Sequence, residues 1–407
     1  MRFPMFLKLW VMSYKILGDY IRKVDNKNKD LKVLNLQGLS MTKEFRKSTS
    51  NIVGTDLSKY KIVKPGQFCC DFMSVIRVHK LPVVLNNLGE DVIISPAYIV
   101  FEITDKNILL PEYLMMWFRR SEFDRYADFR CDSSIRGGFQ WEELCEVELP
   151  VPAIEEQRKA VEQYQSVINK IKVNEQICEK LEATAQALYK HWFVDFEFPN
   201  EEEKPYKSSG GKMVWNEELG KEIPEGWEVK RLGEVSNCLD FKRRPLSQEE
   251  RAEKIGNIPY YGAMSIVGYV DEYLYDGDFL LLSEDGANII DENGYPAIQY
   301  VWGRFWLNNH SHIIEGKDFI TIQFLYNALL KTNVSDLVTG AAQPKINQQN
   351  MNSITILTGT ENIHKNFDSL IDKNYTLTKM YKDQNQKLTQ LQSLLLSRLA
   401  VGEEVSA

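Results

Sequence analysis

The chain has 407 residues, of which 43% are hydrophobic, and a net charge of −8 at pH 7. This length predicts two or three domains with substantial hydrophobic cores. The negative charge argues against a protein that binds nucleic acid on its own without sequence preference.

The N-terminal part of the chain is basic although the whole chain is acidic. Residues 1–64 hold 14 Lys and Arg against 5 Asp and Glu. This excess suits a polyanionic partner, and a solvated lysine-rich surface is the ordinary alternative. The apolar residues 1–11 are too short to span a bilayer and lack a cleavage site, so they are native residues or an upstream extension of a domain that starts near Ser13.

The six cysteines show no CxxC spacing, which is typical of reduced thiols in the cytoplasm. We therefore expect a cytoplasmic protein without disulfides or zinc. The cysteines are Cys69, Cys70, Cys131, Cys145, Cys178 and Cys238.

Residues 13–150 alternate short strand-like runs with turn residues and predict an α+β domain. The expected strands are Tyr60–Val63, Val92–Ile94 and Tyr98–Ile103, and the expected helix is Pro111–Tyr126.

Residues 151–198 predict one long helix, because Glu155 to Phe193 contains no Gly or Pro. Its apolar residues recur every three or four positions, at Val161, Tyr164, Ile168, Ile171, Cys178, Leu181, Ala185, Leu188 and Trp192. Such a narrow seam favours pairing with another helix, with a long core helix as the alternative.

Residues 199–226 form a polar connector, and residues 227–358 repeat the plan of the first domain. The expected strands there are Gly268–Tyr275, Phe279–Ser283 and Phe305–Leu307, and the expected helix is Phe319–Leu330. Residues 359–402 predict a second long helix that ends at Gly402, with a seam at Phe367, Leu370, Asn374, Leu377, Tyr381, Gln384, Leu388, Leu391 and Leu395.

The two halves of the chain resemble each other. KILGDYIRKV at Lys15 is similar to KRLGEVSNCL at Lys230, and a shift of about 207 residues aligns Leu149 with Ile356. The order is therefore domain, helix, domain, helix. We expect two α+β domains, each followed by a long helix, with the two helices forming an antiparallel coiled coil.

Three stretches resemble the DNA-specificity subunits of type I restriction-modification systems. They are LPVPAIEEQRKAV at Leu149, ALYKHWFVDFEF at Ala187 and IPEGWEVKRLGEV at Ile223. The second half lacks the Pro-x-Pro and Glu-Glu-Gln pattern and has ILTGTENIHK at Ile356 instead. The resemblance covers nearly the whole chain from Ser13.

This resemblance implies target-recognition domains at 13–150 and 227–358, each of which binds one half of a bipartite double-stranded DNA sequence. The helices would set the spacer and hold two adenine-methylating subunits, and motor-nuclease subunits would complete a restriction enzyme. The contacts expected with partner subunits are Trp192, Phe193, Leu391 and Leu395.

The chain itself shows no motif for catalysis. It has no Asp/Asn-Pro-Pro-aromatic tetrapeptide, no GxxxxGK[ST] phosphate loop and no GxGxxG turn, so we expect a non-catalytic subunit without a cofactor. His310 and His312 are the best metal candidates, and a polar strand or turn is the more common meaning of such a pair.

Basic and Gly-containing loops are the candidate DNA contacts, because phosphates bind Lys, Arg and backbone amides while base edges bind polar side chains. The candidates are Lys43, Arg46, Lys47, Arg136, Gly137, Gly138, Lys242, Arg243, Arg244, Gln343 and Lys345. Tyr260 and Tyr261 would support a groove or lie in the core. A coiled-coil scaffold that touches no DNA is the alternative function, favoured by the seam and the negative charge.

Overall fold

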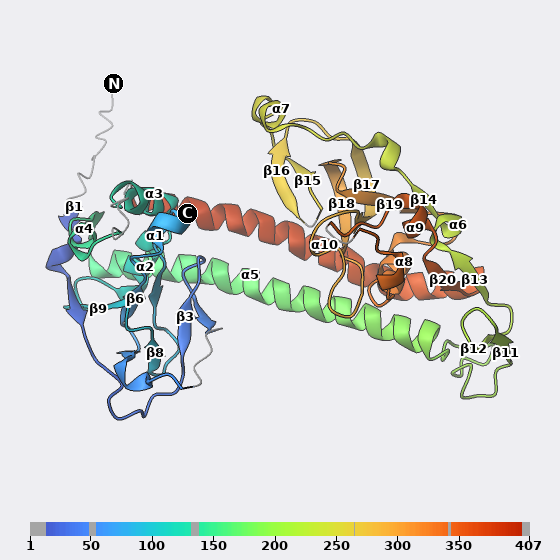
Figure 1. Ribbon diagram of the computed structural model, residues 1–407, viewed down its shortest axis with the longest axis horizontal. Coiled ribbons are helices and arrows are strands. Elements are labelled where there is room, and N and C mark those ends of the chain that lie inside the picture. The colour runs from blue at the N-terminus through green and yellow to red at the C-terminus, as the bar shows by residue number, and fades with distance from the viewer. Residues whose placement is uncertain (1–13, 49–53, 132–137, 264, 341–342, 401–407) are drawn as a thin grey trace, which may run out of the picture. The chain divides into compact units, whose positions relative to one another are not determined.

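The computed structural model describes residues 14–48, 54–131, 138–263, 265–340 and 343–400. The chain forms two compact units (Figure 1). Unit 1 comprises Met1–Val173 and Asn385–Ala407, and unit 2 comprises Asn174–Gln384. Both units combine helices with sheets whose strand pairs are antiparallel, except for the parallel pair β15–β18 in unit 2, so the α+β prediction is confirmed. Within the described ranges, the helices are too polar or too short to cross a membrane.

Unit 1 is built on a four-stranded antiparallel sheet. The strand order is β2 (Ile21–Val24), β9 (Ile99–Ile103), β6 (Phe68–Cys70) and β7 (Val83–Leu85). Two further pairs are β3 (Gln37–Leu39) with β4 (Phe45–Lys47), and β5 (Lys61–Val63) with β8 (Val92–Ile94). The short helical segments are η1 (Leu17–Asp19), η2 (Leu57–Lys59), α1 (Val75–Val78) and α4 (Trp141–Cys145).

The prediction of one continuous helix over Pro111–Tyr126 is wrong in one respect, because the structure has two helices there. They are α2 (Pro111–Phe118) and α3 (Ser121–Phe129), separated by Arg120 in an extended conformation. The break lets the rings of Phe118 and Phe123 meet with centroids 4.8 Å apart. Packing of these two rings in the core outweighs the continuous helical pattern.

Unit 2 is built on a six-stranded sheet with a hydrophobic cluster on each face. The strand order is β14 (Ser236–Cys238), β19 (Ser311–Gly316), β17 (Tyr275–Ser283), β18 (Ile298–Leu307), β15 (Ile258–Tyr261) and β16 (Ile266–Val270). Leu280 and Leu282 pack with α8 (Ile322–Leu329), whereas Leu281 packs with Phe305. Alternate residues of one strand therefore serve opposite faces. The other helical segments are η4 (Asp240–Lys242), α7 (Gln248–Glu253) and η5 (Ser335–Leu337).

Two expectations for this half need correction. The run Gly268–Tyr275 is not one strand, because β16 ends at Val270 and β17 begins at Tyr275. The connector 199–226 contains a hairpin of β11 (Met213–Asn216) and β12 (Lys221–Pro224), and Ile223 is buried in the core of unit 2. This segment is therefore partly folded structure rather than a plain linker.

The two long helices are α5 (Ile154–Tyr189), continued by a π turn over Lys190–Val194, and α10 (Glu361–Arg398). In unit 1, Gln392 of α10 donates to the Tyr164 hydroxyl of α5 at 3.1 Å. In unit 2, Asn174 of α5 donates to Gln384 at 2.8 Å, and Cys178 lies against the Thr378 carbonyl. Residue numbers fall along α10 as they rise along α5, so the helices pair antiparallel within each unit, as predicted.

The expected seam of α10 is displaced by one residue over part of its length. Leu370 is 54% exposed, and the buried positions after Phe367 are Ile371, Tyr375 and Thr378. Apolar residues three or four positions apart can be assigned to either of two neighbouring seams on this helix. The prediction followed the seam through Leu370, which is the exposed one.

The internal repeat is confirmed down to strand register. In unit 1, β1 (Tyr14–Ile16) pairs with β10 (Glu148–Pro150), which places Lys15 opposite Leu149. In unit 2, β13 (Glu228–Arg231) pairs with β20 (Thr355–Thr358), which places Lys230 opposite Ile356. The Leu17 amide donates to Val147 at 2.8 Å, and the Leu232 amide donates to Ile354 at 2.8 Å. The short helices α6 (Leu232–Val235) and α9 (Gln348–Asn352) of unit 2 correspond to η1 and α4 of unit 1.

Candidate nucleic-acid interface

Four segments that are far apart in the sequence meet at one edge of the six-stranded sheet in unit 2. They are residues 240–244 after β14, 284–286 after β17, 308–310 before β19, and 343–345; we call them the loop cluster. Glu284 accepts from Arg243 at 2.7 Å and pairs with Lys345 at 2.9 Å, and His310 contacts Asp285 at 2.7 Å. The structure thus brings together basic, amide-containing and histidine-containing segments that the sequence indicated separately.

A buried network of charges holds the loop cluster. His312 is almost completely buried, and its two ring nitrogens face the Asp240 carboxylate at 2.5 Å and the Ile346 carbonyl at 2.8 Å. Both ring nitrogens are therefore engaged by oxygen atoms of neighbouring segments. Arg243 lies between Asp240 at 3.1 Å and Glu284. Opposite charges therefore fix the backbone of residues 240–243.

The two carboxylates of this network are ionised. Burial raises the pKa of Asp240, but the hydrogen bond and charge of His312, with Arg243 and the Ile313 amide, outweigh it and the net pKa is lowered. Burial likewise opposes ionisation of Glu284, and hydrogen bonds from Lys345 and Arg243 lower its pKa overall. Removal of one partner would leave an uncompensated buried charge.

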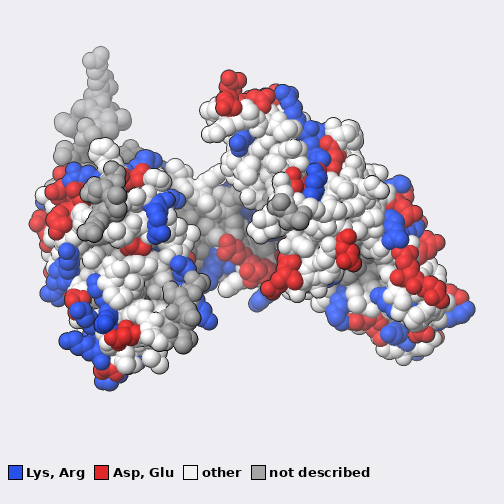
Figure 2. Space-filling model, viewed as in Figure 1, with Lys and Arg blue, Asp and Glu red and all other residues white. Residues whose placement is uncertain are grey.

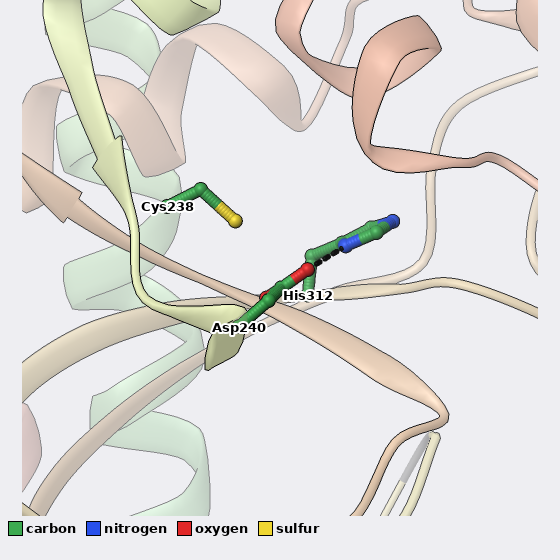
Figure 3. A group of neighbouring side chains, drawn as sticks. All are labelled: Cys238, Asp240 and His312. Atoms are coloured by element: carbon green, nitrogen blue, oxygen red, sulfur yellow. Dashed lines mark hydrogen bonds and ion pairs between the residues drawn. The ribbon is translucent and has the colours of Figure 1, made fainter. Parts of the chain in front are cut away.

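His310 and His312 do not converge on a common point, contrary to the geometry expected for a metal-binding pair. His310 precedes β19 and faces Asp285, whereas His312 lies within β19 and faces Asp240. Cys238, Asp240 and His312 do lie together (Figure 3), with ligand atoms within 4.8 Å of one another. Burial raises the pKa of the Cys238 thiol to about 12, so it stays protonated, and both nitrogens of His312 are already engaged. This trio is better suited to anchoring a loop than to binding a metal.

The candidate DNA contacts of unit 2 fall into two groups. Lys242, Arg244, Gln343 and Lys345 have exposed side chains, although Lys345 is also paired with Glu284. Arg243 is mostly buried in the charge network, so its expected role as a DNA contact does not fit the structure. Tyr260 is buried, and its hydroxyl accepts from the Leu246 amide at 3.1 Å.

The candidates of unit 1 lie on the β3–β4 hairpin and in the loop before α4. Arg46 and Lys47 are exposed on β4. Lys43 is buried and bonds to Asp124 at 2.7 Å, so the prediction that it contacts DNA does not fit. Burial lowers the pKa of Lys43, with partial compensation by Asp124.

The loop before α4 is only partly described. Arg136 and Gly137 lie outside the described residues. Gly138 has φ +145°, and a Cβ atom there would lie 3.2 Å from the Phe72 carbonyl oxygen. A larger residue at position 138 would therefore push this loop away from the neighbouring turn.

Two of the four residues expected to contact partner subunits are core residues. Trp192 and Phe193 are buried in unit 2, where the Phe193 ring lies 5.1 Å from the Phe367 ring. These aromatic residues stabilise the helix pair and offer no surface to a partner. Leu391 is 43% exposed, whereas Leu395 packs partly against the core of unit 1.

Charge is distributed in patches rather than over one broad surface. On the face drawn in Figure 2, Lys and Arg lie in separate groups between Asp and Glu. Sequence reasoning missed Asp240 and Glu284. These two carboxylates determine which basic residues of the loop cluster are held in ion pairs and which are not. No local pattern marks them, because their partners lie on other strands. It also passed over the exposed ring of Phe241, which directly precedes the basic run 242–244.

Comparisons with known proteins agree with this architecture. Residues 224–388 match the family model described as type I restriction modification DNA specificity domain. The type I restriction enzyme MjaIX specificity subunit of Methanocaldococcus jannaschii is 26% identical over 325 residues, covering 74% of this chain and 71% of that protein. Residues 224–388 are therefore similar to a type I DNA specificity domain, and the chain is similar to a type I specificity subunit over about three quarters of its length.

Two further comparisons give the same kind of similarity. A putative type I restriction enzyme specificity subunit of Haemophilus influenzae, S.HindORF215P, is 36% identical over 146 residues, and the match spans 37% of that protein. The crystal structure of the type I restriction-modification S subunit from M. genitalium has a TM-score of 0.56 at 14% identity, covering 97% of this chain and 96% of its own. The fold of the specificity subunit is therefore shared along almost the whole chain.

Proposed function

We propose that this chain is a specificity subunit that binds a bipartite DNA sequence and directs partner subunits to methylate adenine at N6 and to restrict unmodified DNA. The observation that carries the proposal is the repeated frame, with β1–β10 in one half and β13–β20 in the other. Two copies of one recognition plan within a single chain suit a target that has two different halves.

Each target-recognition domain would read one half-site, the first with residues 13–150 and the second with residues 227–358. The β3–β4 hairpin presents Arg46 and Lys47, and the loop cluster presents Lys242, Arg244, Gln343 and Lys345. Lys and Arg neutralise phosphates, and Gln is suited to a bidentate contact with adenine. Regions 151–198 and 359–402, which contain the paired helices, would set the spacer and hold two methylating subunits, to which motor-nuclease subunits would be added.

Sequencing of methylated genomic DNA tests the function as a whole. The gene would be removed from cells that keep its methylating partner. We expect N6-methyladenine to disappear from one bipartite motif, because the partner would have lost its means of recognition. An unchanged methylation pattern would count against the proposal.

A salt titration tests the loop cluster. The complex of the full chain with its methylating subunits would carry Lys242→Gln and Arg244→Gln, and its affinity for a duplex with the motif would be measured at several salt concentrations. Loss of two phosphate contacts should reduce the slope of log affinity against log salt by about 1.8, at roughly 0.9 for each contact.

The matched control carries Lys204→Gln and Lys207→Gln. This variant loses the same charge from two exposed positions in the connector 199–226. Its slope should equal that of the wild type. Equal slopes for all three proteins would remove the loop cluster from the interface.

A further inference from the structure

Phe241 is an apolar ring held out into solvent within a basic segment. It lies in η4 and is 78% exposed. The Lys242 ammonium lies 5.7 Å from its ring centroid, and Arg244 is exposed three residues later. An aromatic residue so placed contributes little to the core, and burial against a partner would be favourable.

The backbone that carries Phe241 is fixed on both sides. The Asp240 carboxylate bonds to His312 and accepts from the Ile313 amide at 2.9 Å. After Phe241, the Lys242 amide donates to Leu239 at 3.1 Å and the Arg243 amide donates to Asp240 at 3.0 Å. The ring therefore projects from a rigid base, which reduces the entropy lost when it inserts into a partner.

The first half of the chain shows that the frame does not need an aromatic residue here. From the paired strands β1 and β13, the repeat aligns residues 25–29 (Asp-Asn-Lys-Asn-Lys) with residues 240–244 (Asp-Phe-Lys-Arg-Arg). Asn26 stands where Phe241 stands, and it is also exposed. The two positions correspond in the sequence repeat and differ in chemistry, although residues 240–242 form η4 whereas Lys27 forms an isolated bridge with Lys61.

We infer that Phe241 is a wedge that inserts at a base step of the half-site bound by the second recognition domain, while Lys242 and Arg244 hold the flanking phosphates. An apolar ring followed by exposed cations is complementary to a base beside phosphates, whereas a purely apolar groove on a protein would not accommodate the cations. Wedge side chains of this kind unstack a base step and kink the duplex. The inference rests on the proposed function, and the repeat restricts it to one half-site, because the first domain has Asn26.

Fluorescence of 2-aminopurine tests the inference. The complex of the full chain with its methylating subunits would be bound to duplexes that carry the probe at successive positions of the methylated motif. We expect wild-type protein to enhance fluorescence at one step in the half-site of the second domain, because the probe brightens when it is unstacked. Phe241→Ala should abolish the enhancement and weaken binding by about 5- to 150-fold, the range for loss of one base–aromatic stack. Phe241→Trp should retain both.

Asn26→Ala is the matched control, and it should change neither the fluorescence nor the affinity. Wild-type affinity and an unchanged fluorescence profile for Phe241→Ala would overturn the wedge and leave the proposed function standing. Loss of the methylating subunits from the Phe241→Ala complex would also overturn it, because the ring would then be a protein contact. Failure of the wild-type complex to prefer the motif would refute the proposed function together with the wedge.

Discussion

Asp368 is a half-buried carboxylate whose removal should stabilise the protein at neutral pH. It lies on α10 and accepts a hydrogen bond from the Thr321 hydroxyl, the N-cap of α8, at 2.9 Å. Burial raises the pKa of Asp368 to about 6, the Thr321 hydrogen bond opposes this shift, and the charge of Asp372 adds to it. Asp368→Asn keeps an oxygen acceptor for Thr321 and removes the charge.

The magnitude follows from the difference between the folded and unfolded pKa values. The folded state binds the proton more tightly, so the contribution of Asp368 to stability is complete below about pH 4 and is lost as the pH rises through about 6. A pKa of about 6 against 3.8 sets an upper limit of about 3 kcal/mol at pH 8, and solvent screening of this half-buried carboxylate reduces it. The gain from Asp368→Asn should therefore be about 1–2 kcal/mol at pH 8 and about half of that at pH 5.

Urea unfolding at both pH values, followed by tryptophan fluorescence, measures this gain. Glu292→Gln removes a carboxylate from an exposed turn of the same unit and should change the unfolding free energy by less than about 0.5 kcal/mol. If Asp368→Asn gave the same gain at pH 5 and pH 8, or lost stability at pH 8, the carboxylate would not be destabilised by burial and the reasoning would be wrong.

Three further changes have expected outcomes. Phe367→Ala empties a fully buried site and should lower the unfolding free energy by about 3–5 kcal/mol in urea titrations; a loss below about 1 kcal/mol would contradict the packing. Burial lowers the pKa of His364 to about 4, so stability should fall by about 3 kcal/mol as the pH drops from 6.5 to 4, and His364→Gln should flatten that part of the profile. Gly18→Ala places a Cβ atom 2.9 Å from that of Cys145 and should cost about 1–3 kcal/mol in thermal unfolding. Gly54→Ala is the comparison variant. Its Cβ atom meets nothing within 4 Å, but φ is +78°, so it tests backbone strain without a clash.

The frame of the molecule could be predicted from the sequence because it depends on local, periodic features. Residues 155–193 contain no helix breaker and carry a regular seam, and α5 covers nearly that range. The alignment of Lys15 with Lys230 and of Leu149 with Ile356 was visible in the sequence, and both pairs occupy equivalent positions in the strands. Hydrophobic periodicity and self-similarity are properties of neighbouring residues, so they do not require knowledge of the fold.

The candidate site was less predictable because charge does not reveal exposure. Lys43 and Arg243 look like their basic neighbours in the sequence, yet both are paired with distant acids. Asp124 is 81 residues from Lys43, and Glu284 is 41 residues from Arg243. Whether a cation is anchored or free depends on which strand lies beside it, and that is a property of the tertiary structure.

The two halves differ most where the frame constrains them least. Arg243 closes its loop through Asp240 and Glu284, and Asn28, the residue aligned with it, closes the equivalent loop with two hydrogen bonds to Val33. Closure of the loop is thus retained in both halves, although a buried amide replaces a buried ion pair. The side chain two residues before each closing residue is exposed, so packing within the fold does not determine its type. It is Asn26 in one half and Phe241 in the other. The exposed side chain can therefore differ between the halves while the loop stays closed, because the closing residue holds the loop and the exposed residue does not.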